Sequence, residues 1–460
     1  MPSAPSAPPP EGSPAGPLGP GESAAVSSLP PLVHGSKLHT SLKVTARQIE
    51  WVFRARREHG DSFRLKTLIH DEPVTMVSHP DHVKSLMTAK PDLAPSVTGE
   101  SPLRPIVGPN STLTALGARH MRQRKLLLPS FHGDAVARYE AMIADAAERE
   151  VDGWSPGDEV LLASRMQAIT LDVIMAGIFG IEGRPERGTP EHDLRRAIRI
   201  IADLSTRAIG QVGELLNAGR DEPVGVTKLA MARLDKPVYA VIAARRADPA
   251  AAAERTDVLS LLLRATTEEG ELLSDRELRD ELLTLVLAGH ETTANQLAWT
   301  FERLVRTPEA WARLRAEPEG AYADATIYEG QRSRPVIPVV GRRVTVPWRF
   351  GEHTVPAGMV SLMSILLLHH RDDLYPDPFA FRPERFEDTK PGTYAWIPFG
   401  GGIRRCLGAA LAMAEMRIVL ATIARRCELR AADPAPERAK HRNVTMIPAD
   451  SARVVVVSRD

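Results

Sequence analysis

The sequence predicts one mainly α-helical domain with a small β region, an α+β fold, and three observations support this prediction. Apolar residues recur at helical spacing over most of residues 116–315. Within that range, residues 274–306 contain no proline and open with Ser274-Asp275-Arg276-Glu277, a capping box. Short β-branched segments lie nearer both ends of the chain. Because so long a helix has to cross the whole domain, we expect it to be the central element.

The N-terminal segment differs from the rest in composition. Residues 1–35 are rich in proline, serine, glycine and alanine, and no lysine or arginine precedes Lys37. This composition predicts a disordered or loosely packed tail, with residues 36–460 as a single domain. The segment has neither the basic start of a secretory signal nor the roughly 20 apolar residues of a membrane anchor. We therefore expect a soluble, cytoplasmic protein without a membrane anchor.

Charge and cysteine content narrow the class of protein further. The 58 basic residues balance the 58 acidic residues, so no overall charge indicates binding to nucleic acid. Only two cysteines occur, Cys406 and Cys427, which is typical of a reduced, intracellular protein. We interpret Cys427 as a small residue of the core.

Before the long helix, the pattern predicts a mixed start and then a helical body. We expect a helix over residues 41–58, strands over 62–69 and 73–78, and a helix from Pro80. Residues 90–117 are rich in proline, glycine, serine and threonine and predict a long irregular segment, a candidate lid over a substrate. The predicted helices of the body cover residues 134–154, 165–179, 191–216 and 229–247.

After the long helix, Thr307 is predicted to cap a new helix that has Pro308 at its first position. Strands are predicted in the last third of the chain. They cover residues 339–346, 353–355 and 359–361, together with a late hairpin formed by 444–447 and 453–458.

The most informative motif isolates Cys406 between a glycine-rich turn and a predicted helix. Residues 399–408 read Phe-Gly-Gly-Gly-Ile-Arg-Arg-Cys-Leu-Gly, and strong helix formers follow. A thiolate is stabilised near a helix N-terminus and beside arginines, here Arg404 and Arg405. The glycines let the backbone approach a flat partner closely. By itself, the loop also fits a glycine-rich turn with a buried structural cysteine, whereas Arg405 stands where a nucleotide loop needs its third glycine.

A second unusual motif, Ala288-Gly289-His290-Glu291-Thr292-Thr293, lies inside the long helix. A glycine in mid-helix costs about 1 kcal/mol, so its presence needs a reason. Ala288, Gly289 and Thr292 share a face, where small side chains would open a groove beside a hydroxyl. The neighbouring Glu291 could supply protons. A zinc helix is excluded because position 294 is alanine, whereas a packing notch for a crossing helix remains an alternative.

These motifs resemble those of the cytochrome P450 family. Phe399, Gly402, Arg404, Cys406 and Gly408 match the haem-ligand loop of that family position by position. The resemblance covers roughly residues 40–458 and implies a P450 fold with the long central helix over the haem. It implies haem b as cofactor, with the Cys406 thiolate as the axial ligand of the iron. The N–H of Gly408 would bond the sulfur, Gly289 would lie at the cofactor, and Glu291 and Thr292 would be catalytic, delivering protons to bound O2.

The resemblance extends to a structural network. Glu329 and Arg332 lie three residues apart on a short predicted helix, and Arg385 lies in Phe-Arg-Pro-Glu-Arg-Phe at 381–386. In the family these three residues form a buried charge network that supports the cysteine loop. Gly330 and Gln331 depart from the family pattern, a difference that we expect to loosen the helix.

The resemblance also implies an anion grip. His120 and Arg124 lie four residues apart on the helix predicted over 117–128 and would bind a haem propionate. Arg342 and Arg404 take the other propionate positions, since guanidinium groups donate paired hydrogen bonds to carboxylates. Arg343 competes with Arg342 for this assignment.

The implied function is that of a monooxygenase, which inserts one oxygen atom from O2 into an apolar or amphipathic small molecule by hydroxylation or epoxidation. The residues expected to line the substrate pocket are Leu285, Ala288, Val336, Val339, Val340, Thr445 and Met446.

Electrons would come from a separate ferredoxin and ferredoxin reductase, because the chain shows no flavin or iron–sulfur signature. Arg119, Arg122, Lys125 and Arg405 could form a basic docking patch for an acidic partner. Two rival functions stay open: a haem-thiolate enzyme that uses peroxide or isomerises its substrate, and a haem-based gas or ligand sensor without turnover.

Overall fold

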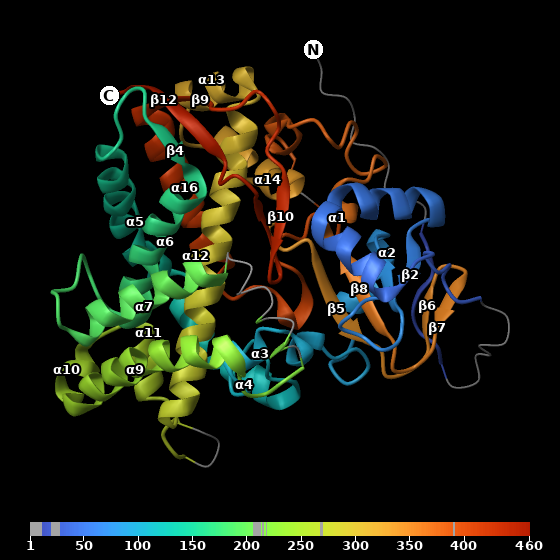
Figure 1. Ribbon diagram of the computed structural model, residues 1–460, viewed down its shortest axis with the longest axis horizontal. Helices are drawn as coiled ribbons and strands as arrows, with labels where there is room; N and C mark the ends of the chain where they lie inside the picture. The colour runs from blue at the N-terminus through green and yellow to red at the C-terminus, as the bar shows by residue number, and fades with distance from the viewer. Residues whose placement is uncertain are drawn as a thin grey trace.

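The computed structural model describes residues 12–19, 28–205, 213, 216–217, 219–266, 270–389 and 392–460. Its central element is α12, Asp275–Leu304, whose 30 residues span about 45 Å. The predicted capping box opens it, since the Ser274 side chain accepts from the Glu277 N–H and the Glu277 side chain accepts from the Ser274 N–H. Figure 1 shows α12 passing through the middle of the molecule, which confirms the predicted central helix.

Helices pack round α12 to form the larger body. α6 (Leu162–Phe179) lies along it, and α5 (Asp134–Asp152) packs against both α6 and α16 (Ala409–Arg426). α7 (Pro190–Ser205) pairs with α9 (Gly225–Ala247) below them (Figure 1). Among the described residues, α6 is the one helix long and apolar enough to cross a membrane, but 72% of it is buried inside the protein, as in a core helix. The shorter helices are α3 (Arg104–Val107), α4 (Gly117–Leu127), α10 (Pro249–Glu254), α11 (Val258–Leu263), α13 (Pro308–Ala316), α14 (Ala321–Ser333) and α15 (Ile365–His369).

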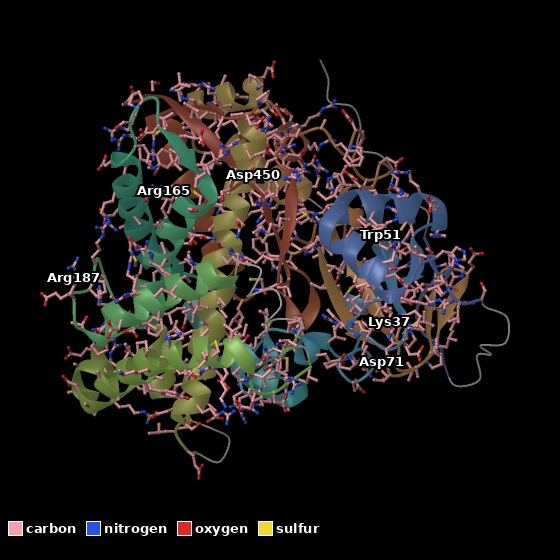
Figure 2. The ribbon with its side chains drawn as sticks, viewed as in Figure 1. Lys37, Trp51, Asp71, Arg165, Arg187 and Asp450 are labelled. Atoms are coloured by element: carbon pink, nitrogen blue, oxygen red, sulfur yellow. The ribbon has the colours of Figure 1, made fainter. Side chains whose placement is uncertain are left out.

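The small β region lies beside this helical body with α1 (Lys37–His59) and α2 (Pro80–Met87) (Figure 1). Its main sheet has the strand order β2-β3-β8-β5. Figure 2 places Lys37 at the start of α1 near Asp71, and the two side chains lie 3.7 Å apart. The strands of the main sheet are β2 (Ser62–Leu65), β3 (Val74–Val77), β5 (Val339–Arg343) and β8 (Val360–Ser364). A second sheet contains β1 (Ala15–Pro17), β6 (Trp348–Phe350) and β7 (His353–Val355). A third contains β4 (Glu159–Leu161), β12 (Arg453–Arg459) and β9 (Cys427–Ala431). In a fourth, β10 (Ala439–Arg442) pairs with β11 (Thr445–Pro448).

The predicted late hairpin is wrong in its pairing. β11 pairs with β10, whereas β12 pairs with β4 and β9. Asn443, with φ of 53°, supports the tight turn between β10 and β11. Ser451 and Ala452 also have positive φ, 64° and 50°, and lead the chain from β11 to a different sheet.

Part of the predicted N-terminal tail is ordered. Within residues 12–19, β1 adds a strand to β6, and the Pro14 carbonyl accepts from the Gly351 N–H at 2.7 Å. The Ser13 N–H donates to Asp81 of α2 at 2.8 Å. Backbone pairing thus holds a proline-rich segment whose composition alone predicts disorder. Residues 1–11 and 20–27 of the predicted tail lie outside the described residues.

Three further expectations need adjustment. The irregular segment predicted over 90–117 contains the short α3 and a 3-10 turn, Val97–Glu100. The Thr307 side chain donates to the Arg303 carbonyl at 3.0 Å and does not cap α13. Of the helix predicted over 191–216, α7 ends at Ser205, and most of the following residues lie outside the described ranges.

Gly330 allows α14 to approach α12 closely. A Cβ at this position would overlap the hydroxyl of Thr300 on α12, and Thr300 is itself fixed by donating to the Gln296 carbonyl at 2.8 Å. The expectation that Gly330 loosens its helix is therefore replaced by a packing role, in which the missing side chain makes room for the neighbouring helix. The side chain of the buried Gln331 beside it contacts Met416, whose sulfur lies 4.0 Å from Gln331 Nε2.

A fully buried ion pair joins α14 to distant segments. Arg332 donates to both carboxylate oxygens of Glu329 at 2.6 and 2.7 Å, and both side chains are 0% exposed. The same guanidinium donates to the carbonyls of His369 and Pro378, each at 2.8 Å. Arg385 completes the predicted trio, because its Nε lies 3.5 Å from Glu329 Oε1. Every one of these contacts holds a segment that leads toward the Cys406 loop.

Gly330→Ala should destabilise the protein by about 1–3 kcal/mol, because the new methyl overpacks the α12–α14 contact. Adding Thr300→Ala removes the overlapping hydroxyl and should recover most of the loss. Urea unfolding measures both variants. Equal losses for the single and double variants would contradict the packing role.

Glu329→Gln should lower the free energy of unfolding by about 3–5 kcal/mol, because it leaves the Arg332 charge buried without its carboxylate. Glu319→Gln is the matched control: Glu319 pairs with Arg425 at the surface, with side chains 69% and 49% exposed. That control should change stability by less than about 1 kcal/mol in the same denaturation experiment.

Candidate functional site

The Cys406 loop is held in one conformation by its own backbone. The Cys406 N–H donates to the Phe399 carbonyl at 2.9 Å. Gly400 and Gly402 have φ of 67° and 61°, which glycine adopts without strain. A Cβ on Gly402 would overlap the carbonyl of Met87, so this glycine also lets the loop touch α2. The loop therefore requires glycine for close approach as well as for its turn.

Cys406 and Cys427 differ in their surroundings as predicted. Cys427 is 0% exposed and belongs to the helical core, whereas Cys406 is an exposed, free cysteine just ahead of α16. The surrounding protein raises the pKa of the Cys406 thiol by desolvation, while the Gly408 N–H and the Arg124 and Arg405 charges act in the opposite direction. A coordinated metal cation would deprotonate this thiol outright. The residue is thus exposed, while its thiol has a backbone donor and two arginine charges nearby that suit a thiolate.

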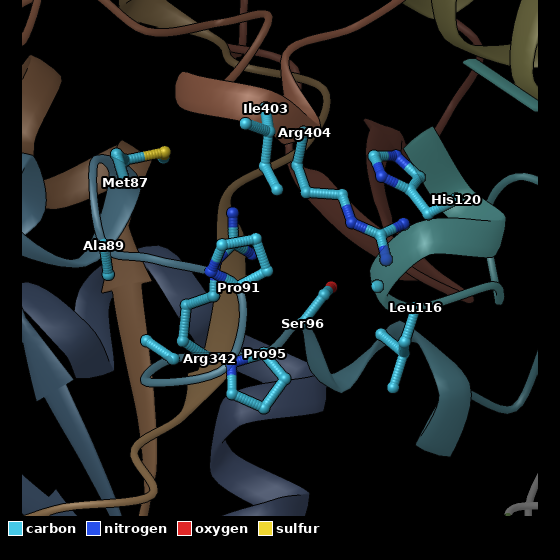
Figure 3. Close-up of a pocket in the computed structure, with 12 residues that line it drawn as sticks. Met87, Ala89, Pro91, Pro95, Ser96, Leu116, His120, Arg342, Ile403 and Arg404 are labelled. Carbon is cyan, nitrogen blue, oxygen red and sulfur yellow. The ribbon is translucent and has the colours of Figure 1, made fainter. Parts of the chain in front are cut away.

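Three cationic side chains from distant segments line one pocket. His120 comes from α4, Arg342 from β5 and Arg404 from the turn before Cys406. Figure 3 shows Arg404 beside His120, with Arg342 reaching the same hollow from the other side. His120 and Arg342 are 2% and 6% exposed, so the pocket holds the buried charge of Arg342 beside a buried histidine ring.

No acidic side chain among the described residues pairs with these cations. Arg404 donates to the carbonyls of Thr112, Leu113 and Ala115, and Arg342 donates to the Gly341 carbonyl at 3.0 Å. Burial and the nearby arginines lower the pKa of His120 to about 4, and burial lowers that of Arg342 to about 10. Two arginine charges without a counter-charge, beside a neutral histidine ring that can donate an N–H, fit a ligand with two carboxylates, as the propionates of haem are.

The structure decides between Arg342 and Arg343. Arg342 lines the pocket, whereas Arg343 leaves it and pairs with Glu100 at 2.7 Å. Arg124 does not line this pocket either; it donates to the Arg405 carbonyl at 2.6 Å and its charge acts on Cys406. Of the residues predicted for the anion grip, His120, Arg342 and Arg404 therefore share one pocket, whereas Arg124 contacts the cysteine loop.

On α12, the predicted groove face consists of Ala288 and Thr292. Ala288 is exposed, and the Thr292 hydroxyl donates to its carbonyl at 2.6 Å. Gly289 does not belong to this face, because a Cβ there would lie 2.5 Å from Ile174 of α6. The missing side chain of Gly289 thus provides a packing notch that lets α6 approach α12, the alternative considered for this motif, and its place at the cofactor stays a prediction.

The substrate residues expected from sequence separate into accessible and buried ones. Leu285 is half-buried and Ala288 exposed. Met446 is 0% exposed and packs in the core beside α1, so its place in the predicted pocket is corrected. Thr445 and Val336 are each 5% exposed. Val339 and Val340, adjacent on β5, pack against different core clusters.

Two contacts of the site were not predicted from sequence: that of Arg442 with Glu291 and that of His369 with Ile397. Glu291 Oε1 accepts from Arg442 Nε at 2.6 Å, a contact across 151 positions of sequence. His369, whose carbonyl bonds Arg332, accepts from the Ile397 N–H at its Nε2, 2.8 Å away. Burial lowers the pKa of His369 to about 3, so the ring is neutral and can accept. No local spacing signals either contact, since both partners come from distant segments.

Comparison with known proteins agrees with this geometry. A sequence model of the cytochrome P450 family matches residues 31–455. Putative cytochrome P450 138 of Mycobacterium tuberculosis is 36% identical over 438 residues, covering 94% of this chain and 97% of that protein. Putative cytochrome P450 137 of the same organism is 38% identical over 387 residues, or 83% of this chain and 80% of that protein.

Solved structures show the same fold. The retinoic acid-bound cyanobacterial CYP120A1 superposes with a TM-score of 0.79 at 22% identity, covering 94% of this chain and all of that one. The cytochrome P450 CYP102L1 superposes with a TM-score of 0.78 at 23% identity and the same coverage. With an accessible cysteine, a cationic pocket and a long helix in one fold, the chain belongs to the cytochrome P450 family, haem-thiolate monooxygenases that bind haem b through a cysteine.

Proposed function

We propose that this P450 inserts one oxygen atom from O2 into an apolar or amphipathic small molecule, by hydroxylation or epoxidation. The observation that carries the proposal is the buried cationic pocket without an acidic partner among the described residues, next to the accessible Cys406. When bound, haem supplies the oxidising chemistry, and the cysteine thiolate biases it toward cleavage of the O–O bond. The chain's own residues hold the cofactor, admit the substrate and move protons.

Each group of residues at the site would have its own role in holding the cofactor. Cys406 would ligate the iron, with the Gly408 N–H as hydrogen-bond donor to the sulfur. Arg342 and Arg404 would neutralise the propionates, and His120, neutral because its pKa is about 4, would donate an N–H rather than a charge.

Thr292 and Glu291 would form the proton route. The Thr292 hydroxyl donates to the Ala288 carbonyl at 2.6 Å, which orients its oxygen lone pairs outward from the helix. The Glu291 side chain is 17% exposed, so it can exchange protons with solvent. Accessible apolar residues for the substrate are Leu285, Ala288 and Val444, the last 39% exposed at the turn between β10 and β11.

Electrons would arrive from a separate ferredoxin and its reductase. Met121, Lys125 and Leu128 share one exposed face at the end of α4, and Arg124 ties this helix to the exposed Arg405 beside the thiolate. Such a face, apolar with positive charges, suits an acidic redox partner.

Arg119 has a different place from the one predicted for it. It turns toward Asn110, at 2.6 Å, and Glu277, at 3.8 Å, so it contributes little to that face.

Both cysteines are free, in keeping with the proposed cytoplasmic location.

The proposed chemistry is tested with ¹⁸O2. The reduced protein with carbon monoxide should show a thiolate-type Soret band, and Cys406→Ser should abolish it. Apolar candidates that shift the spectrum of the resting enzyme should gain one ¹⁸O atom when ferredoxin, reductase and ¹⁸O2 are supplied. Product formed with peroxide alone, and never with O2 and redox proteins, would favour a peroxide-using enzyme. Spectral binding without any turnover would favour a ligand sensor.

Lys125→Glu should slow ferredoxin-supported reduction about tenfold at low salt, because it reverses a charge on the proposed docking face. The difference should shrink as salt is added. Stopped-flow reduction with the same ferredoxin measures both effects. Lys236→Glu, an exposed lysine of α9, is the matched control and should leave the rate unchanged. Equal rates for wild type and Lys125→Glu would remove α4 from the docking face.

A further inference from the structure

We propose that Arg442 is a positioning residue for proton delivery: with Thr445, it clamps one oxygen of Glu291 and leaves the other to carry the proton. This inference rests on the proposed function, since it concerns the acid of the proton route. The pairing joins the β10–β11 hairpin to the middle of α12 and is not signalled by any sequence spacing.

The clamp is asymmetric. Glu291 Oε1 accepts from Arg442 Nε at 2.6 Å and lies 2.9 Å from the Thr445 hydroxyl, which also lies 2.7 Å from the Arg442 carbonyl. For Oε2, no hydrogen-bond partner is present among the described residues. One oxygen is thereby fixed and the other is available to exchange a proton with water and pass it along the helix toward Thr292.

Both side chains of this ion pair are mostly buried, so each holds the other in place. The Arg442 side chain is 4% exposed, and Glu291 is its acidic partner among the described residues. Leaving such a cation without its carboxylate is costly, so the guanidinium restrains the rotation of Glu291 as strongly as Glu291 restrains it. A carboxylate held in one rotamer meets the geometric requirement of a proton donor better than a freely turning one.

The hairpin that supplies the clamp is itself anchored. Trp299 Nε1 of α12 donates to the Met446 carbonyl at 3.0 Å, and the Met446 N–H donates to the Val336 carbonyl at 2.7 Å. Both bonds are made by the backbone of Met446, next to Thr445, and hold this part of the hairpin against α12. Met446, predicted to contact substrate, instead serves to hold Thr445 and Arg442 against Glu291.

The test follows proton uptake without a substrate. Substrate-free holoenzyme is supplied with ferredoxin, its reductase and NADPH in air-saturated H2O and D2O buffers. The rate of peroxide release is measured, each H2O2 taking two electrons from NADPH and two protons. Arg442→Gln should slow release about tenfold and enlarge the solvent isotope effect, a part of the 10²–10⁴ that a positioned acid contributes. Arg442→Lys should recover part of the rate. Thr445→Val, which keeps the charge pair, should give a smaller change in the same direction.

A double-variant cycle distinguishes a positioning role of Arg442 toward Glu291 from a purely structural role. In a Glu291→Gln background, Arg442→Gln should cause no further slowing, because the group it positions is gone. Thermal unfolding supplies a readout independent of turnover, in which the losses in Tm of Arg442→Gln and Glu291→Gln should be less than additive. Lys440→Gln, another cation of β10, is the matched control and should change neither quantity.

Three results would overturn the inference, and they are distinguishable. If Glu291→Gln slows release but Arg442→Gln and Thr445→Val do not, the clamp has no role. If Arg442→Gln slows release equally with and without Glu291, its effect is structural. If wild type lacks a thiolate-type carbon monoxide band, the proposed function itself fails, and the inference with it.

Discussion

The buried ion pair between Glu329 and Arg332 is the constraint on which the site depends. The Arg332 guanidinium reaches the His369 carbonyl, and the neutral ring of His369 accepts from Ile397, two residues before Phe399. The Phe399 carbonyl then fixes the Cys406 N–H. Two opposite charges in a dry interior are tolerated only in good geometry with their remaining donors satisfied. The pair is therefore held rigidly, and the contacts that lead from it through His369, Ile397 and Phe399 position Cys406.

The opposite situation holds in the pocket beside the loop. There His120, Arg342 and Arg404 meet without a carboxylate among the described residues, and burial lowers the pKa of each. Carbonyl acceptors hold the charges of Arg342 and Arg404 in place beside the neutral ring of His120, so a dianionic ligand would relieve the repulsion between the two guanidinium groups. The protein thus combines one satisfied buried pair that supports the loop with one unsatisfied cluster that favours binding of the cofactor.

Glycines place α12 between its neighbours. Gly289 on α12 admits Ile174 of α6, and Gly330 on α14 admits Thr300 of α12. A glycine in mid-helix costs about 1 kcal/mol in propensity, which close contact between helices can offset. Because α12 is held from both sides, Ala288 and Thr292 keep a defined position on the open face. The glycine in the motif thereby acts through packing.

Much of the site is local in sequence and was predictable for that reason. The turn and thiol of the Cys406 loop, the capping box of α12, and the three-residue spacing of Glu329 and Arg332 involve neighbours within one or two helical turns. Geometry at that range follows from backbone periodicity. The same holds for His120 as a member of the anion grip, because its helix carries it at a regular position.

Only the tertiary structure decided which distant groups meet. It chose Arg342 over Arg343, turned Gly289 toward α6, buried Met446, paired β11 with β10, and added β1 to β6. It also brought Arg442 to Glu291. Each of these outcomes depends on how separate elements pack, which no spacing within one element encodes. The sequence by itself determined the glycine turn, the cysteine and the helix that follows it, whereas packing between elements determined what surrounds them.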